Sequence, residues 1–330
     1  MYYDKQATYP IPPVPSWNVQ DASKLTTFMT CERMYFYEYV LGWRNAIPNN
    51  HPHFGTSWHE AMEYLLLNDY NDSSVVAEAY HKFLTKYREE FDEDSDAAFW
   101  PKTPNRALKA LAEYTVRWKN DQKKFKLLEL NGRPLTEIAG TVHITEDYMM
   151  HFRMDSVMEG INGIFSLDHK TASTSYGWED KWSLELQPTL YNHVLYCMYP
   201  PEQVYGIVLR GTVFKKNKGT RGGTLFEFVE ARVHKTLDQM QTWLWNITSW
   251  LDSVRWNFEM LSNCKESDSV MKAFPMRTIP CAYHYGRPCP YKSFCLMWPN
   301  PLQRCEQPPI GFEVRHWDPS QLESSNQVNL

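Results

Sequence analysis

The sequence lacks the features of a membrane-spanning, exported or nucleic-acid-coating protein. No apolar stretch in its 330 residues approaches the length of a membrane span, and the first ten residues do not resemble a secretory signal. The formal net charge is −5, so the chain is not a generally basic coat, and any groove for nucleic acid has to be local. Hydrophobic residues make up 43% of the chain, as in a globular protein. We therefore expect a soluble, cytoplasmic protein.

Cysteines are few, odd in number and unevenly spread. The seven are Cys31, Cys197, Cys264, Cys281, Cys289, Cys295 and Cys305. In a chain without an export signal, such cysteines are expected to be metal ligands or buried thiols rather than disulfides.

The densest group of cysteines lies near the C-terminus. Cys281, Cys289 and Cys295 are separated by seven and five residues, which is wider than the C-x-x-C spacing of most structural zinc sites. Their neighbours are largely apolar, which suits a metal cluster shielded from water. Three thiolates need a fourth ligand, and Cys31 is the candidate. Cys305 as a ligand and zinc as the metal are the alternatives.

The order of helical and strand-like segments predicts an α/β or α+β fold, with a central mixed sheet flanked by helices. We expect one compact domain made of an extended N-terminal segment, a helical part with Cys31 and His59, a core sheet, a long helix with the cysteine segment, and a tail. Their ranges are 1–21, 22–134, 135–235, 236–305 and 306–330.

Apolar periodicity predicts the individual elements. Helices are expected at about 22–42 and 56–67, twice within 73–123, and at 184–199 and 235–262, and strands at 135–144, 148–157, 164–171, 204–214 and 225–233. Cys31 is expected in the middle of the first helix, and His59 near the first turn of the second. The segment with Trp178 and Trp182 is expected to be a loop.

The stretch 152–171 carries the most informative charges. It is expected to be a β-hairpin in which one strand ends near Asp155 and the next carries Asp168 and Lys170. Residues two apart share a face of a strand, so Asp168 and Lys170 point together. Charged groups in mid-sheet are unfavourable unless they pair or bind an ion. A divalent cation held by two carboxylates, beside a lysine near a scissile phosphate, would explain them.

Each of these features also has a simpler interpretation. An isolated D-x-K motif is more often a surface salt bridge, and a lone helical histidine such as His59 is more often packed or solvated. Gln187 and Tyr191, four residues apart, share one face of their helix. The basic loop after residue 214 could bind phosphates or be an ordinary solvated hairpin. Its cations are Lys215, Lys216, Lys218 and Arg221.

Taken in order, the motifs resemble the RecB-like branch of the PD-(D/E)XK nuclease superfamily. They are the cysteine-led aromatic segment CERMYFYEYVLGW, G-x-x-x-H at Gly55 to His59, Asp155, D-x-K-T at Asp168 to Thr171, Q-x-x-x-Y at Gln187 to Tyr191, and the three C-terminal cysteines. More narrowly, the set is similar to the iron–sulfur members, which include AddB-type nuclease domains, CRISPR-associated RecB-type exonucleases and phage recombination exonucleases.

The resemblance implies a restriction-endonuclease-like core and a role for each motif. Asp155, Asp168, the backbone carbonyl of His169 and His59 would ligate Mg²⁺ or Mn²⁺, and Lys170 would orient or activate the attacking water. Gln187 and Tyr191 would brace the site and contact the DNA. The cysteines at 31, 281, 289 and 295 would hold a 4Fe-4S cluster that clasps the N-terminal helix to the C-terminal segment. Phe152 departs from the family pattern, which has glycine there, and Glu137 is a further residue that could reach the metal.

The expected activity is that of a metal-dependent DNA exonuclease acting on single-stranded or end-resected DNA in recombination or repair. Recombination or helicase proteins would be its partners, and the host cytoplasm its location if it is encoded by a phage. Two alternatives are a structure-selective endonuclease on the same fold and a non-catalytic DNA-binding or CRISPR-adaptation partner.

Overall fold

The computed structural model spans residues 1–330 and describes all of them except 69, 71, 122, 217–224, 283–287 and 322–326. Within the described residues the largest sheet has seven strands, six of them in the order β11-β5-β6-β7-β8-β9, with β2 paired to β6. The strands are β2 (Lys126–Leu127), β5 (Thr136–His143), β6 (Met149–Gly160), β7 (Gly163–Ala172), β8 (Val204–Phe214), β9 (Phe226–Val233) and β11 (Gln327–Asn329).

This sheet is mixed, as predicted. Strands β5, β6 and β7 form an antiparallel meander, β8 pairs with β9 in the same way, and β7–β8 and β11–β5 are parallel pairs. A parallel pair needs a long crossover connection. Between β7 and β8 that crossover is built from two helices, α6 (Trp178–Leu184) and α7 (Leu186–Met198).

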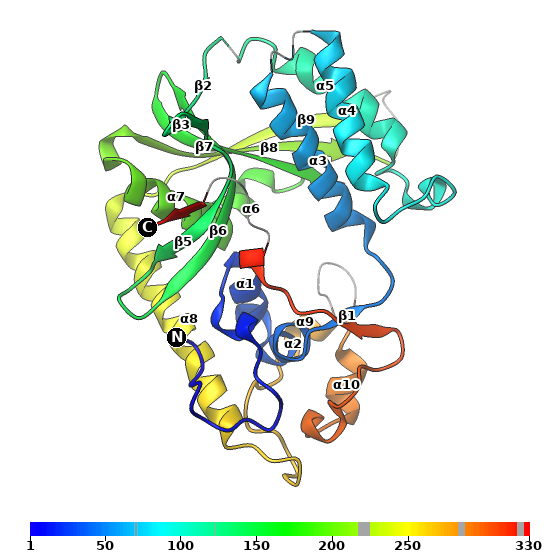
Figure 1. Cartoon of the computed structure of the whole chain (residues 1–330), viewed down its shortest axis with the longest axis vertical. Coiled ribbons are helices and arrows are strands. Elements are labelled where there is room, and N and C mark those ends of the chain that lie inside the picture. The colour runs from blue at the N-terminus through cyan, green and yellow to red at the C-terminus, as the bar shows by residue number, and fades with distance from the viewer. Residues whose placement is uncertain (69, 71, 122, 217–224, 283–287, 322–326) are drawn as a thin grey trace.

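Helices cover both faces of the sheet (Figure 1). On one side lie α3 (Asn50–Leu67), α4 (Ser73–Tyr87) and α5 (Pro104–Arg117), and on the other lie α6 (Trp178–Leu184), α7 (Leu186–Met198) and the long α8 (Leu237–Ser262). The first group encloses an aromatic core with Phe214 and Phe226 of the sheet, and the second shares the main core with β5 and β6. No helix in the described part of the chain combines the length and apolar character needed to cross a membrane.

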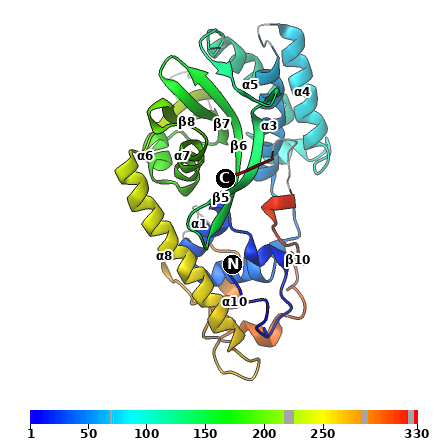
Figure 2. The same ribbon diagram turned by 60° about the vertical axis from the view of Figure 1, so that its left-hand side comes forward.

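A smaller, mainly helical part packs below the sheet, against the far end of α8 (Figure 2). It contains α1 (Ala22–Thr30), α2 (Glu32–Tyr35), a π-helical turn (Phe36–Val40), α9 (Ile279–Ala282) and α10 (Lys292–Met297), and the paired strands β1 (Trp43–Asn45) and β10 (Phe312–Val314). The short strands β3 (Glu129–Leu130) and β4 (Arg133–Pro134) pair with each other before β5 begins.

The predicted hairpin at 152–171 forms, but its first strand is longer than expected, because β6 continues past Asp155 to Gly160. Gly160 pairs with Gly163 across the two-residue turn between β6 and β7. Gly163 has φ +120 and an added Cβ there would lie 2.4 Å from the carbonyl oxygen of Gln203, so the close turn requires glycine.

Three local predictions were wrong. Cys31 is not inside a helix, because its extended backbone (φ −164, ψ 115) separates α1 from α2. Helix α3 begins at Asn50 rather than near residue 56, since Asn49 caps it by accepting from the amide of His51, and His59 therefore lies in mid-helix. Trp178 and Trp182 are on a helix, α6, whose first turn carries the favourable acids Glu179 and Asp180.

Candidate active site

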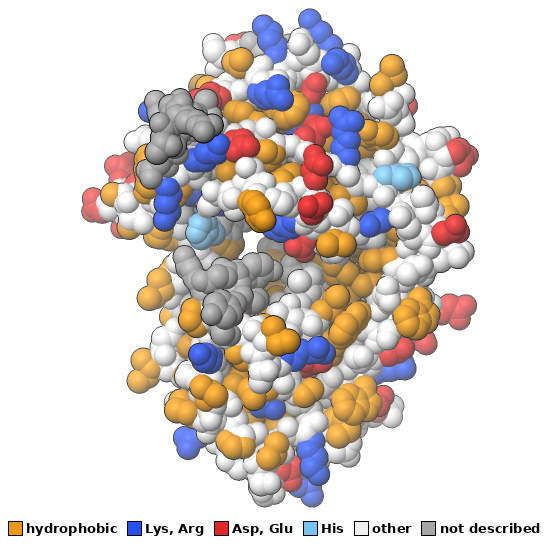
Figure 3. Space-filling model, turned by 180° about the vertical axis from the view of Figure 1, so that it is seen from behind, with side chains coloured by type: hydrophobic (Ala, Val, Ile, Leu, Met, Phe, Trp, Pro, Cys, Tyr) orange, Lys and Arg blue, Asp and Glu red, His pale blue; other side chains and the backbone are white. Residues whose placement is uncertain are grey.

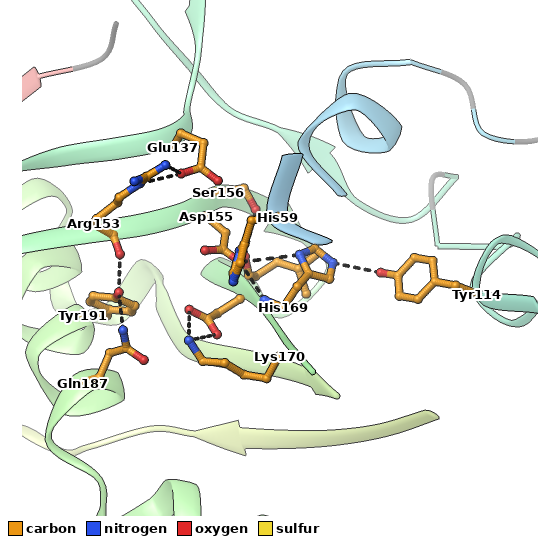
Figure 4. Close-up of polar contacts among 12 residues, drawn as sticks. His59, Tyr114, Glu137, Arg153, Asp155, Ser156, His169, Lys170, Gln187 and Tyr191 are labelled. Atoms are coloured by element: carbon orange, nitrogen blue, oxygen red, sulfur yellow. Dashed lines mark hydrogen bonds and ion pairs between the residues drawn. The ribbon is translucent and has the colours of Figure 1, made fainter. Parts of the chain in front are cut away.

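The hairpin brings Asp168 and Lys170 to the same face of β7. The Lys170 ammonium lies 2.8 Å from Oδ2 of Asp168, and the side chain of Asp168 is only 1% exposed (Figure 4). Burial raises the pKa of Asp168 to about 6, although the cation of Lys170 acts to lower it. This lysine–carboxylate pair is therefore a buried charge pair, not the surface salt bridge of the simpler interpretation.

Asp155 on β6 lies at the meeting point of a helix and the neighbouring strand. Its Oδ2 accepts a hydrogen bond from the backbone amide of His169 at 2.7 Å and lies 2.9 Å from Nδ1 of His59 on α3 (Figure 4). Burial disfavours ionisation of this carboxyl, but His59 and His169 outweigh it and hold the pKa well below its usual range. Burial lowers the pKa of His59, but Asp155 reverses the effect and leaves that pKa raised.

The His169 side chain points away from Asp168 and Lys170, as the alternation of a strand requires. Its Nε2 lies 2.9 Å from the hydroxyl of Tyr114 on α5. His169 therefore ties β7 to α5 through its ring, while its backbone amide holds Asp155.

Glu137 on β5 is the third member of a potential metal site. Among the described residues, one group of three metal-ligating side chains comes together, and ligand atoms of His59, Glu137 and Asp155 all lie within 4.8 Å of one another. Glu137 has φ +46, an uncommon conformation for a residue with a side chain and one that is concentrated at functional sites. Burial and the nearby Asp155 raise the pKa of Glu137 to about 7. The guanidinium of Arg153, whose Nη2 lies 2.7 Å from Oε2 of Glu137, acts to lower it.

This donor set suits a hard divalent cation. The two carboxylates supply the oxygen ligands that Mg²⁺ and Mn²⁺ prefer, while the imidazole nitrogen is a donor more typical of transition metals. Glu137 and Asp155 bring two carboxylates together in a buried place, where burial first and the neighbouring Asp155 second raise the pKa of Glu137. A bound cation would relieve this repulsion. Asp168 faces the same cavity with Lys170 beside it.

Gln187 and Tyr191 of α7 brace β6. The Gln187 amide donates to the Tyr191 hydroxyl at 2.9 Å, and that hydroxyl donates to the backbone carbonyl of Arg153 (Figure 4). Because Arg153 lies two residues before Asp155 and itself holds Glu137, this chain of hydrogen bonds fixes the strand that carries the site.

These side chains line a cavity of about 240 Å³. Two further chain segments close it, and no motif in the sequence points to either. The start of α1 contributes Asp21, Ala22 and Ser23, and the C-terminal segment contributes Trp317 and Pro319. Both reach the site only through the tertiary fold.

The predicted iron–sulfur ligands do not form a metal-binding cluster in the described part of the chain, where no cysteine joins a group at the spacing of ligands around one ion. The four thiols nevertheless lie in one region. Cys295 is influenced electrostatically by the other three, and burial together with that influence raises its pKa to about 12. The amide of Cys289 also donates to the carbonyl of Cys281 at 3.1 Å.

The remaining cysteines have other surroundings. Cys305 donates its thiol to the carbonyl of Leu302 at 3.2 Å. Cys197 is exposed and Cys264 is buried, and none of the three takes part in the group of four.

The structure describes two of the four cations of the basic loop. Lys215 pairs with Glu227 at 2.7 Å, and the carbonyl of Lys216 accepts from the indole of Trp100, whereas Lys218 and Arg221 lie outside the described residues. Seen from behind, basic and acidic side chains are interspersed over the sheet-bearing half of the molecule (Figure 3). The face drawn there agrees with the expectation that any attraction for nucleic acid is local.

The chain matches a known protein family. The model of the PD-(D/E)XK nuclease superfamily matches residues 22–296, which include His59, Glu137, Asp155, Asp168 and Lys170. No curated protein matches the chain.

Proposed function

Because the chain belongs to the PD-(D/E)XK nuclease superfamily, we propose that it is a divalent-metal-dependent DNA exonuclease of the RecB-like branch. One observation carries the proposal: His59, Glu137 and Asp155 converge beside the buried pair of Asp168 and Lys170. Hydrolysis of a phosphodiester needs an activated water, a Lewis acid on the phosphoryl oxygen and a cation near the developing charge. The residues of the cavity could hold a metal ion for the first two needs, and Lys170 is the cation for the third.

His59, Glu137, Asp155 and Asp168 would hold Mg²⁺ or Mn²⁺. When bound, the ion would lower the pKa of a water molecule and withdraw charge from the phosphoryl oxygen. The Lys170 ammonium, kept protonated by Asp168 despite its burial, would hold the attacking water and stabilise charge on the phosphate. The amide of His169 and the imidazole of His59 fix the orientation of the Asp155 carboxylate.

Gln187 and Tyr191 act through the backbone. Their hydrogen bonds hold the carbonyl of Arg153 on β6, two residues before Asp155. The Tyr191 hydroxyl is already committed to that carbonyl, so its proposed part is positioning rather than proton transfer.

The decisive experiment is Mg²⁺-dependent degradation of linear and circular single-stranded DNA. Lys170→Met should abolish cleavage, because it removes the cation beside the reacting phosphate, with a loss of at least about 100-fold. Lys181→Met is the matched control, since Lys181 is exposed on α6 near the site. Loss of linear DNA alone supports an exonuclease, and cutting of circles supports the endonuclease alternative. A wild-type protein inert on every substrate would contradict the nuclease assignment.

We also propose that Cys31, Cys281, Cys289 and Cys295 bind a 4Fe-4S cluster. The support is the family resemblance and the mutual electrostatic influence of the four thiols. A cubane spans more space than one ion, so its ligands can start farther apart than those of a single metal ion. Anaerobically purified protein should contain about four irons, fewer in Cys295→Ala and an unchanged number in the exposed-site control Cys197→Ala. Stoichiometric zinc without iron would identify a zinc site instead.

A further inference from the structure

The C-terminal segment crosses the middle of the molecule (Figure 1), and two of its residues line the candidate active-site cavity. It is tied at both ends, because β10 pairs with β1 in the smaller part and β11 pairs with β5 at the edge of the large sheet. Trp317 and Pro319 lie between these two attachments. They line the cavity that also contains His59, Asp155 and Lys170.

The indole of Trp317 is held by a dedicated partner. Its Nε1 donates to Oδ2 of Asp21 at 2.8 Å, while Oδ1 of Asp21 accepts from the amide of Lys24 at 2.7 Å and caps α1. Both oxygens of Asp21 are therefore engaged by the protein. Although Asp21 lines the cavity, its arrangement points to orienting the indole rather than binding a metal.

Among the described residues that line this cavity, Trp317 is the tryptophan, tyrosine or phenylalanine whose ring is accessible. Its other aromatic or large apolar lining residues are Phe152, Leu190 and Tyr191, whose exposures are 2%, 0% and 3%. Trp317 is partly exposed, and its one polar atom is already hydrogen-bonded. Trp317 also packs against the main core, so the part of its ring that remains exposed is what it can offer to a planar ligand.

We propose that Trp317 stacks on a base of the bound strand and makes the site selective for single-stranded DNA. The proposal rests on the proposed nuclease function and names the form of its substrate. Aromatic side chains bind unpaired bases through their π-faces, which are covered in a duplex. A cavity of about 240 Å³ is below the usual size of small-ligand pockets, so no more than a nucleotide-sized part of the strand can enter it.

Binding is measured in the Lys170→Met background, so that DNA is not consumed. The probes are a fluorescein-labelled oligothymidylate and a duplex of the same length, at one fixed salt concentration. Trp317→Ala should weaken binding of the single strand by about 5- to 150-fold, and the preference for single strand over duplex should fall with it. Trp317→Phe should restore binding to within about threefold of the parent, because it keeps a stacking ring.

Two comparisons make the test specific. Trp245→Ala removes a tryptophan that is 72% exposed on α8 and does not line the cavity, and it should leave both affinities unchanged. Trp317→Leu replaces the ring with an apolar, non-aromatic side chain, so the Phe–Leu contrast tests stacking even if the alanine variant is unstable.

The outcomes separate the two proposals. Equal affinities of the Phe and Leu variants, or an unchanged preference for single strand in a folded Trp317→Ala protein, would overturn the role of Trp317 alone. If wild type neither cleaves DNA nor binds either probe, the proposed function and this inference fall together.

Discussion

Glu137 combines an uncommon backbone conformation, burial and a nearby carboxylate in one residue. A glutamate with φ +46 next to Asp155 is unfavourable unless the surrounding structure stabilises it. The guanidinium of Arg153 stabilises it in part, because its Nη2 lies 2.7 Å from Oε2 of Glu137. The sequence alone placed Glu137 on the first strand and within possible reach of the metal. Its joint position with His59 and Asp155 could not be predicted, because the three residues come from β5, α3 and β6.

Glu137→Gln should weaken Mn²⁺ binding by at least about tenfold, the size of effect known for residues that support metal ligands. The measurement is a Mn²⁺ titration followed by electron paramagnetic resonance, which does not depend on activity. Glu129→Gln, at an exposed site on β3, is the control and should bind Mn²⁺ like wild type. Equal Mn²⁺ affinities of wild type and Glu137→Gln would remove Glu137 from the metal site.

Lys24 is a second residue whose charge depends on the fold. It is completely buried and donates to the backbone carbonyl of Val19 at 2.7 Å, and burial lowers its pKa to about 8 despite the opposing effect of Asp21. Between pH 8 and the ordinary lysine pKa of about 10.4, the unfolded chain therefore binds more protons than the folded one. The contribution of Lys24 to the free energy of unfolding must then rise with pH.

The expected rise, relative to Lys24→Met, is about 2 to 3 kcal/mol across that pH window. It is measured by urea unfolding of both proteins at several pH values, and the methionine variant cancels the contribution of other titrating groups. A stability difference between the two proteins that does not change with pH would show that the pKa of Lys24 is not lowered.

At the scale of elements, the strands were predicted better than the helix ends. Alternating apolar residues and the glycine turn identified the β5–β6–β7 meander, because that information is local. The break at Cys31 is not local. The amide of Arg33, just after the break, donates to the carbonyl of Pro275, and its guanidinium donates to that of Phe274, so a distant segment supplies the partners.

Helix α7 should influence catalysis through the hydroxyl of Tyr191. Tyr191→Phe removes the hydrogen bond to the Arg153 carbonyl, and a loss of about 0.5–1.5 kcal/mol should lower kcat up to about tenfold. Tyr196→Phe is the matched control, because that hydroxyl donates to the carbonyl of Lys235, which does not line the cavity. Steady-state kinetics with a linear DNA substrate, together with thermal unfolding, would check this. Equal losses of kcat in both variants would indicate a general effect on the fold.

At the scale of the whole molecule, the C-terminal segment joins the two parts across the site. Its attachment to β5 depends on Gly140, where an added Cβ would lie 1.6 Å from the carbonyl oxygen of Val328 on β11. The sequence did not predict β11 or this contact. A three-residue strand has almost no periodic signal, and its parallel partner lies far back in the chain.

Gly140→Ala should therefore detach β11 from β5 and leave the C-terminal segment open to proteases and to hydrogen exchange. The measurement is limited proteolysis followed by mass spectrometry. Gly55→Ala is the matched control, since its nearest neighbour would be an ordinary 3.9 Å from the new Cβ. A C-terminal segment equally protected in both variants would mean that β11 is not held by this close approach.

The order of the strands along the chain has a consequence for the order of folding. Pairing of β5, β6 and β7 can form early, because the three strands follow one another in sequence. His59, the α7 brace and Trp317 reach the cavity only through contacts between distant parts of the chain, and such contacts close slowly. We therefore expect a partly folded chain to carry Asp155, Asp168 and Lys170 without their supports, so that it cannot hydrolyse the nucleic acid around it before folding is complete.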